Sequence, residues 1–306
     1  MEYPDIFFTP EYQELFKDTA FGGEPRCFRS AGIEYRFYAR PIEETGYFDI
    51  VSPYGYSGPI DIDGQPDWDK FLSSFHSYCQ GEYIIAEFAR LHPFLQNHLY
   101  LEAGRVVKSG EVVYIDLTQS EEDIWRGFDK GCKSAIKKAL KSEGRLMPPI
   151  KGCLIAFPEL YCSTMKRNNA HNAYLFSDDF FRASDNLVHT IGALSLGGNL
   201  IAANLLLRYG DYCHYWLAGG QPRNGVGNLL LWEAIKWAKK QGCKIFNLGG
   251  GLTEGDNLSS FKRSFSKTTM PFFTYRKIHN PEIYNQLCQA KGIYPTSEGY
   301  FPAYRR

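Results

Sequence analysis

Hydrophobic and polar positions alternate along some segments of the chain and recur every three to four residues along others. Alternation and short apolar runs predict strands, at residues 33–51, 83–88, 188–195, 199–207, 211–217 and 244–248. The longer spacing predicts helices, at residues 66–79, 121–142, 157–170, 177–187 and 228–241. Residues 104–117 are interpreted as a hairpin that turns at 108–110. Together these elements predict an α/β fold, an α+β mixed sheet with helices packed on it.

The rest of the chain is organised around residues 212–265. An aromatic strand leads through the turn Gly225-Val226-Gly227 into the helix at 228–241. Gly242 ends that helix, and the strand at 244–248 leads into Gly249-Gly250-Gly251. Backbone amides at the start of a helix that follows a glycine turn can receive an anion. This stretch therefore predicts an anion-binding turn.

The helix predicted at 121–142 has two faces. Its apolar face is formed by Ile124, Phe128, Cys132, Ala135, Ile136 and Ala139. Its other face carries a lysine ridge, formed by Lys130, Lys133, Lys137 and Lys141. Such a ridge is either an ordinary solvated face or a surface for phosphates, and both interpretations stay open.

Composition and charge narrow the functional classes. The chain has 306 residues, 44% of them hydrophobic and 22% charged, which suits a globular protein of two domains. No apolar run approaches the roughly 18 residues of a membrane span, and the N-terminus does not resemble a signal peptide. Residues 1–150 hold 16 Lys and Arg against 24 Asp and Glu, so the remaining 156 residues hold 18 against 10. A strongly basic nucleic-acid binder is not indicated, whereas a local anionic ligand is compatible with the second half.

The eight cysteines are scattered, without a CxxC pair or a histidine spaced to complete a metal site. We therefore expect free thiols in a reducing cytoplasm and no bound metal. Residues 144–149 are interpreted as a linker, which predicts domains at 1–146 and 147–306, with the tail 281–306 packed back on the first. The halves share no visible sequence repeat.

The Gly225–Gly227 turn, placed between a strand and a helix, resembles the acyl-CoA pyrophosphate loop of the GNAT acyltransferase fold. Members usually carry Arg or Gln three residues before the first glycine, where this chain has Pro222 between Gln221 and Arg223. The resemblance implies a donor-binding group, which consists of Gln221, Arg223, Asn224, Gly225, Gly227 and Asn228.

A longer resemblance, over about residues 50–266, is to the FemAB-like branch of that fold, which includes peptidoglycan-bridge aminoacyltransferases and acyltransferases of polysaccharide gene clusters. The segments that carry it are 52–59, 125–139, 161–170, 228–234, 248–251 and 261–265. This resemblance implies two GNAT-like subdomains with a cleft between them. It also implies N-acyl transfer, in which an amine attacks an activated acyl carbonyl of acyl-CoA or aminoacyl-tRNA.

Lys262 matches the position of an active-site lysine in Fem enzymes, and we expect it to stabilise a phosphate or an oxyanion. His214 and Tyr215 lie on the strand beside the implied acyl site with side chains on opposite faces, so either one faces the site or both pack in the sheet. Asp256 either accepts the amine proton or only shapes a turn. Further candidates for substrate contacts are Tyr54, Tyr56, Lys133, Lys137, Arg167 and Arg263. The two tyrosines lie in a turn-rich loop that reads as exposed, and their rings either cap a core or line a ligand site.

The leading hypothesis is a cytoplasmic N-acyltransferase that moves an acyl group from acyl-CoA to an amino sugar in a nucleotide- or lipid-linked polysaccharide precursor, with peripheral contact to a lipid-linked substrate. The alternative is a Fem-type aminoacyltransferase that uses aminoacyl-tRNA and a peptidoglycan precursor. A third hypothesis is a catalytically silent GNAT-like module that binds a glycan or a partner.

Overall fold

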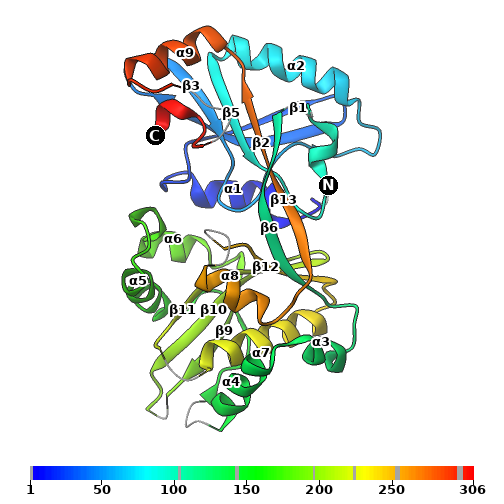
Figure 1. Ribbon diagram of the computed structural model, residues 1–306, viewed down its shortest axis with the longest axis vertical. Helices are drawn as coiled ribbons and strands as arrows, with labels where there is room; N and C mark the ends of the chain where they lie inside the picture. Colours follow the sequence, from blue (N-terminus) through cyan, green and yellow to red (C-terminus); the bar gives the residue numbers. More distant parts are fainter. Residues whose placement is uncertain are drawn as a thin grey trace. The chain divides into compact units, whose positions relative to one another are not determined.

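The computed structural model describes residues 3–102, 105–141, 145–195, 197–222, 225–251, 256–294 and 299–306 (Figure 1). The chain forms two compact units, each with its own core. Unit 1 comprises mainly residues 7–109 and 271–306, and unit 2 comprises residues 4–6 and 110–270. The main divisions between these units follow residues 109 and 270, whereas the predicted boundary follows residue 146.

The strands of unit 1 follow the order β1-β2-β3-β5-β13, with β4 paired to β2. Strands β3 and β5 run parallel, and the other pairs are antiparallel. Its strands are β1 (Glu24–Ser30), β2 (Ile33–Ile42), β3 (Tyr47–Val51), β4 (Ile60–Asp61), β5 (Ile84–Arg90) and β13 (Thr269–Ile278). Its helices are α1 (Pro10–Phe16), α2 (Trp68–Gly81) and α9 (Pro281–Ala290), with 3-10 turns at Asn97–Tyr100 and Ala303–Arg305.

The strands of unit 2 follow the order β6-β12-β11-β10-β9-β7, with β8 paired to β9. Within the described residues of unit 2, β11 and β12 pair in parallel and the other neighbouring strands pair antiparallel. Its strands are β6 (Val106–Asp116), β7 (Arg145–Leu146), β8 (Ile150–Lys151), β9 (Val188–Leu194), β10 (Leu200–Tyr209), β11 (Tyr212–Gly220) and β12 (Ile245–Gly249). Its helices are α3 (Glu121–Gly127), α4 (Lys130–Leu140), α5 (Phe157–Arg167), α6 (Asp178–Ala183), α7 (Val226–Lys240) and α8 (Asn257–Arg263).

The two units repeat one topology, although their sequences do not repeat. In each, three antiparallel strands are followed by a helix and by a fourth strand parallel to the third: β1-β2-β3-α2-β5 and β9-β10-β11-α7-β12. The fifth strand is exchanged, because β6 follows β5 in the chain but pairs with β12, whereas β13 follows β12 but pairs with β5. A single cut of the chain therefore does not separate the units.

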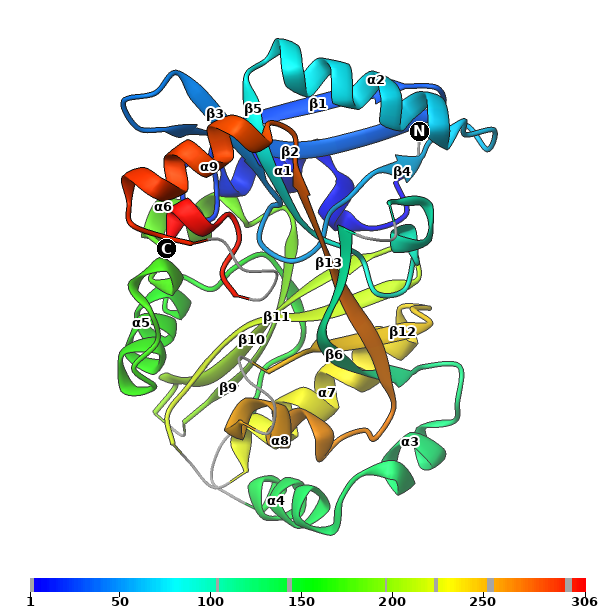
Figure 2. The same cartoon turned by 45° about the horizontal axis from the view of Figure 1, so that its top comes forward.

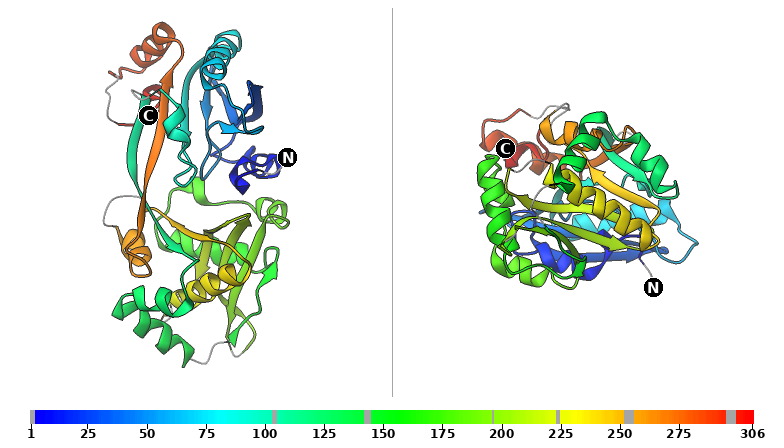
Figure 3. Two further views of the ribbon diagram at one scale, coloured as in Figure 1. Left: turned by 90° about the vertical axis from the view of Figure 1, so that its right-hand side faces the viewer. Right: turned by 90° about the horizontal axis from the view of Figure 1, so that it is seen from below.

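Helices α2, α5, α7 and α9 each pack on strands of their own unit, whereas α4 packs on α7. In unit 2, α7 contributes Leu230, Leu231 and Ala234 to a core in which all three are fully buried, and α7 packs on β10 and β9 (Figure 2). Helix α5 packs on β11 and β10 (Figure 3). In unit 1, α9 and the C-terminal turn pack Tyr284 and Tyr304 against β5. Full burial of one such side chain contributes roughly 1.5–3 kcal/mol, so these faces fix where the helices lie.

Three predicted elements differ from the structure. The helix predicted at 121–142 is broken into α3 and α4, because Phe128 and Asp129 have extended backbone and Asp129 begins a new helix. Residues 106–116 form one strand, β6, instead of a hairpin, since it pairs with β12 beyond the predicted turn. Part of the predicted linker is β7, which pairs with β9 through Arg145 and Leu146.

None of the helices in the described ranges is both long enough and apolar enough to cross a lipid bilayer.

Candidate functional site

The parallel strands β11 and β12 stay paired only at their beginnings. Their register joins Tyr212 to Ile245, Cys213 to Phe246 and His214 to Asn247, although β11 runs on to Gly220 and β12 to Gly249. At the last pair, the Asn247 amide donates to Nδ1 of His214 at 3.2 Å and accepts the backbone N–H of Gly249 at 2.9 Å. The Asn247 side chain thus accepts a backbone N–H that a longer β11–β12 ladder would have used. We call this place the strand fork.

The corresponding strands of unit 1 do not part in this way. Beyond the last β3–β5 pair, the backbone N–H of Ser52 donates to the Phe88 carbonyl at 3.1 Å, and the Ser52 hydroxyl accepts the N–H of Arg90 at 2.7 Å. Ser57 donates from its backbone N–H to the carbonyl of Arg90 at 2.6 Å. Two serines therefore hold β3 and β5 together where β11 and β12 separate.

A second feature is the first turn of α7, which begins directly after Gly225. Gly225 is the N-cap residue with φ +75°, and a Cβ atom there would lie 2.2 Å from the carbonyl oxygen of Ala135 in α4. Only glycine fits this left-handed, closely packed position. Gly227 is exposed, with no other heavy atom within 4 Å of an added Cβ. Glycine has no side chain to cap the helix, so its first amides can bind an anion.

Some of the predicted donor-binding residues lie at or near this turn. Asn228 donates from Nδ2 to the sulfur of Cys132 at 3.6 Å, and so ties α7 to α4. Gln221 is exposed and its backbone N–H donates to the Ile201 carbonyl at 2.8 Å. Arg223 and Asn224 lie outside the described residues.

Helix α4, which packs against this turn through Ala135, carries the lysine ridge. Cys132, Ile136 and Ala139 are its buried face, and the ridge lysines are on its other side. Lys137 is exposed, whereas Lys133 donates from Nζ to the Arg126 carbonyl at 2.8 Å and thereby caps α3. The ridge is therefore solvated, and part of it has a structural task.

Lys262 is a buried lysine of unit 2. Its side chain is only 7% exposed, and its Nζ lies 2.5 Å from the carbonyl oxygen of Gly250, to which it donates. Burial lowers the pKa of Lys262 to about 8, while the nearby Asp256 carboxylate acts in the opposite direction. A Cβ on Gly249 would be 3.3 Å from Nζ. The glycine triplet thus leaves room for an ammonium group.

Asp256 is the N-cap of α8, and its Oδ1 accepts the backbone N–H of Ser259 at 2.6 Å. This is the turn chemistry that the sequence offered as the simpler interpretation. Arg263, the residue after Lys262, forms an ion pair with Glu111 at 3.1 Å. Arg167 donates to the carbonyl of Gly220 at 2.7 Å, at the end of β11.

His214 and Tyr215 point to different surroundings, as alternation along a strand predicts. His214 is 3% exposed, and its Nε2 lies 2.8 Å from Oδ2 of Asp5. Since Nδ1 accepts from Asn247, Nε2 carries the proton and donates to Asp5. Tyr215 packs against the core of unit 2, and burial raises the pKa of its hydroxyl. Asp5 and Asn247 are not among the candidates from the sequence, because Asp5 lies 209 positions from its partner and no local pattern marks it.

Tyr56 and Tyr54 belong to unit 1, and the expectation of an exposed loop is wrong for Tyr56. Its side chain is 9% exposed and its ring meets Phe7 edge-on at 5.1 Å. The backbone carbonyl of Tyr54 accepts the Tyr12 hydroxyl at 2.6 Å, and its ring lies 5.0 Å from that of Phe21. Both rings pack against other aromatic side chains of unit 1. A substrate contact through either one stays a prediction.

The segment that carries these features resembles a known protein family. Residues 160–263 match the family model described as Acetyltransferase (GNAT) domain. That range spans the strand fork, the first turn of α7 and Lys262. No curated protein matches the sequence.

Solved structures share the fold at low sequence identity. FemX superposes with a TM-score of 0.65 and 12% identity, over 90% of this chain and 97% of its own. L-PGS from Bacillus licheniformis superposes with a TM-score of 0.60 and 13% identity, over 94% and 98%. A protein of unknown function from Bacteroides thetaiotaomicron VPI-5482 gives 0.59 and 11%, over 87% and 88%. These likenesses establish the fold alone.

Proposed function

We propose that this chain transfers an acyl group from acyl-CoA to the amine of an amino sugar in a nucleotide- or lipid-linked polysaccharide precursor. The match of residues 160–263 to the GNAT acetyltransferase domain and the likeness of the fold to FemX support this proposal. The observation that carries this proposal is the strand fork beside the uncapped first turn of α7. Separated parallel strands offer backbone groups to an extended donor, and the helix amides offer hydrogen bonds to its phosphates. The exposed lysines of α4, the helix that packs against α7, add positive charge to this part of the unit.

In the proposed reaction, the neutral amine attacks the thioester carbonyl. The C–N bond forms, the C–S bond breaks, and the proton lost by the amine balances the proton gained by the CoA thiolate. Negative charge builds on the carbonyl oxygen during the attack, and a buried ammonium group stabilises such charge more strongly than an exposed one. Lys262 is our candidate for that group, because it is charged below pH 8 and shielded from water. The many Tyr and Trp residues suit stacking on a sugar.

Binding of acetyl-CoA by calorimetry tests the donor site. The variant Gly227→Trp fills the space in front of the α7 amides, and Gly81→Trp is the matched control, since Gly81 is likewise a helical glycine with nothing within 4 Å. We expect micromolar binding by the wild type and by Gly81→Trp, and at least a 30-fold loss in Gly227→Trp. If Gly227→Trp binds as tightly as the wild type, the donor does not use this turn.

The Fem-type alternative is supported by the lysine ridge on α4, which also suits RNA phosphates. Its test is binding of aminoacyl-tRNA by the wild type and by a Lys137→Glu variant over a range of salt concentrations. Tight, salt-sensitive binding of tRNA, together with no binding of millimolar CoA, would replace the acyl-CoA proposal by this one. Binding of either donor without transfer to any amine would favour a silent module.

A further inference from the structure

Exposed apolar side chains gather in one stretch of unit 2. Within the described part of this unit, five large apolar side chains stand exposed, and four of them fall in residues 140–155. These four are Leu140, Leu146, Ile150 and Ile155, which are 59%, 38%, 37% and 100% exposed. A single exposed apolar side chain is ordinary, whereas several in one place mark a contact surface.

Strand pairing keeps this stretch together in space. Strands β7 and β8 both pair with β9, at its residues 193–194 and 189–190, on the side of β9 away from β10. The backbone N–H groups of Met147 and Gly152 continue the contact, since each donates to a carbonyl of the β9 segment at 2.9 Å. Leu140 and Ile155 lie within five residues of this run, so the chain holds them within about 18 Å of it.

The same stretch has a one-sided charge. Residues 130–158 contain seven Lys and Arg against one acidic residue, Glu143. The basic side chains that are exposed from residue 137 onward are Lys137, Lys138, Lys141, Arg145 and Lys151. Among the described residues, none of these five forms an ion pair. We call the described residues of 137–155 the basic edge.

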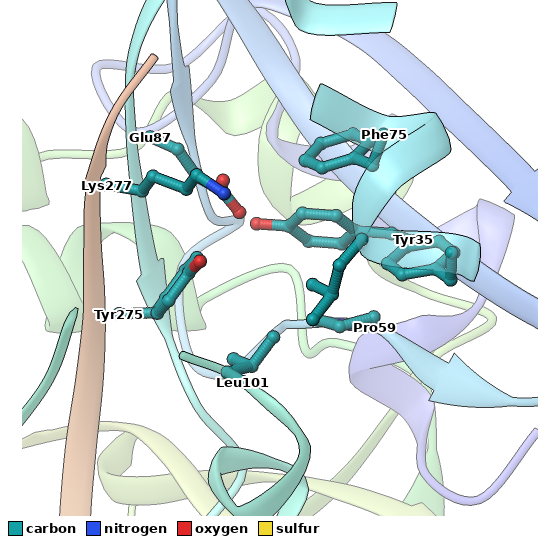
Figure 4. Close-up of a pocket in the computed structure, with 9 residues that line it drawn as sticks. Tyr35, Pro59, Phe75, Glu87, Leu101, Tyr275 and Lys277 are labelled. Carbon is teal, nitrogen blue, oxygen red and sulfur yellow. The ribbon is translucent and has the colours of Figure 1, made fainter. Parts of the chain in front are cut away.

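Charges elsewhere in the molecule are compensated. In the small cavity of unit 1, Figure 4 shows the Lys277 nitrogen next to the Glu87 carboxylate, at which the Tyr35 hydroxyl is also directed. Lys277 pairs with Glu102 as well. The basic edge therefore differs in leaving its positive charge to the solvent or to a partner.

Two adjacent prolines restrict what that partner can be. Pro148 and Pro149 lie between β7 and β8, and both are exposed. Proline has no backbone N–H, so this part of the edge cannot extend a ladder of hydrogen bonds to a strand from another chain. A second copy of this chain would also bring like charges together. Both features argue against self-association through this edge.

We propose that the basic edge binds the anionic headgroup region of a lipid bilayer. Its Lys and Arg side chains pair with headgroup phosphates, while its exposed Leu and Ile side chains enter the boundary between headgroups and acyl chains. RNA phosphates would satisfy the basic side chains but would leave the apolar ones in water. The combination of both kinds of side chain therefore favours the bilayer.

Vesicle binding itself does not depend on the proposed acyl transfer. One consequence rests on that proposed function: contact with a bilayer selects the lipid-linked form of the acceptor over the nucleotide-linked form. Acetyl-CoA calorimetry separates the two ideas. A wild-type chain that binds vesicles but no acetyl-CoA would support the basic edge and refute the proposed donor.

Co-sedimentation of the full chain with vesicles tests the basic edge. The vesicles consist of phosphatidylcholine alone or of phosphatidylcholine and phosphatidylglycerol in equal parts. We expect binding to the mixed vesicles that is at least about tenfold stronger than to the neutral ones, and that weakens about tenfold when the salt concentration rises from about 0.1 M to about 0.5 M.

A triple variant tests the apolar contribution: Leu146→Ser, Ile150→Ser and Ile155→Ser. It should lose at least about tenfold in binding to mixed vesicles, with an unchanged melting temperature because all three side chains are exposed. The matched control changes three exposed apolar side chains of unit 1, which are 64%, 64% and 88% exposed: Tyr83→Ser, Leu99→Ser and Tyr294→Ser. The control should bind like the wild type.

A second triple variant tests the charge: Lys141→Glu, Arg145→Glu and Lys151→Glu. We expect at least about a 30-fold loss on mixed vesicles. Its control makes the same change of net charge at exposed lysines elsewhere, namely Lys70→Glu, Lys240→Glu and Lys291→Glu. Since salt screens distant charges, this control should lose less than about threefold.

Three results would overturn the proposal. The first is equal binding to neutral and mixed vesicles, or mixed-vesicle binding that both edge variants retain. The second is no vesicle binding together with tRNA binding that the apolar variant retains, which would assign the edge to nucleic acid. The third is no vesicle binding together with a dimer in sedimentation equilibrium that the apolar variant dissociates, which would assign the edge to a second copy.

Discussion

Replacing Lys262 by methionine should change how the stability of unit 2 depends on pH. Methionine keeps the length of the side chain but carries no charge. In the wild type, folding moves the ammonium group into a site where it is 7% exposed, with the Gly250 carbonyl as its hydrogen-bond acceptor. The variant removes both the buried charge and this hydrogen bond.

The size of the effect follows from the pKa of Lys262, which is lowered from 10.5 to about 8. At about 1.4 kcal/mol per pKa unit, the buried charge costs the folded state about 3 kcal/mol. Below pH 8 both states are protonated, so this cost is present in full. Between pH 8 and 10.5 the folded state releases the proton while the unfolded state keeps it, so wild-type stability rises relative to the variant.

Urea unfolding of both proteins between pH 6.5 and 10.5 measures this difference. Tryptophan fluorescence suits the purpose, because four of the five tryptophans lie in unit 2. We expect the stability of Lys262→Met minus that of the wild type to fall by about 3 kcal/mol as the pH rises. The lost hydrogen bond shifts the whole curve without changing its slope, since it contributes about equally at each pH.

Lys240→Met is the control, because Lys240 is an exposed lysine of α7. Its stability should follow that of the wild type across the pH range. Parallel curves for Lys262→Met and the wild type would refute the reasoning, since they would mean that Lys262 titrates normally in the folded protein.

Further predictions concern catalysis and packing. If charged Lys262 stabilises the oxyanion, kcat should fall as the pH rises through about 8, and Lys262→Arg should move that fall to higher pH. Asp256→Asn should keep the stability of α8 and Asp256→Ala should lose roughly 1 kcal/mol in chemical denaturation; full activity in the Asn variant would exclude Asp256 as the base. Gly225→Ala should lower the melting temperature by several degrees, since its Cβ would meet the Ala135 carbonyl at 2.2 Å. Ser52→Ala should cost unit 1 roughly 1–2 kcal/mol, measured by urea unfolding, because it leaves the Arg90 amide unpaired.

Local periodicity was enough to predict most elements. The helices α2, α5, α6 and α7 and the strands of the β9-β10-β11 meander lie where spacing placed them, within a few residues. Their apolar faces are decided by short-range geometry, because a repeat of two or of three to four residues is a property of neighbouring positions. The mixed α/β fold and the GNAT resemblance rest on the same local order of strand, glycine turn, helix and strand.

Pairing between distant segments was not readable in this way. The exchange of β6 and β13 between units, and the pairing of β7 with β9, depend on which strand edges meet. The break at Phe128 and Asp129 is held by the Asp129 N–H, which donates to the carbonyl of Ser264 at 2.8 Å. No pattern within residues 121–142 contains that partner.

The same distinction between local pattern and long-range packing applies to the candidate site. The sequence by itself determined which residue types were available: a glycine turn before α7, a lysine on α8 and a ridge of lysines on α4. Only the tertiary structure decided that Lys262 is buried against Gly250, that Asp5 accepts from His214, and that β11 and β12 part while β3 and β5 stay closed. The reason is physical: burial, and with it pKa, depends on long-range packing, which positions far apart in the chain create together.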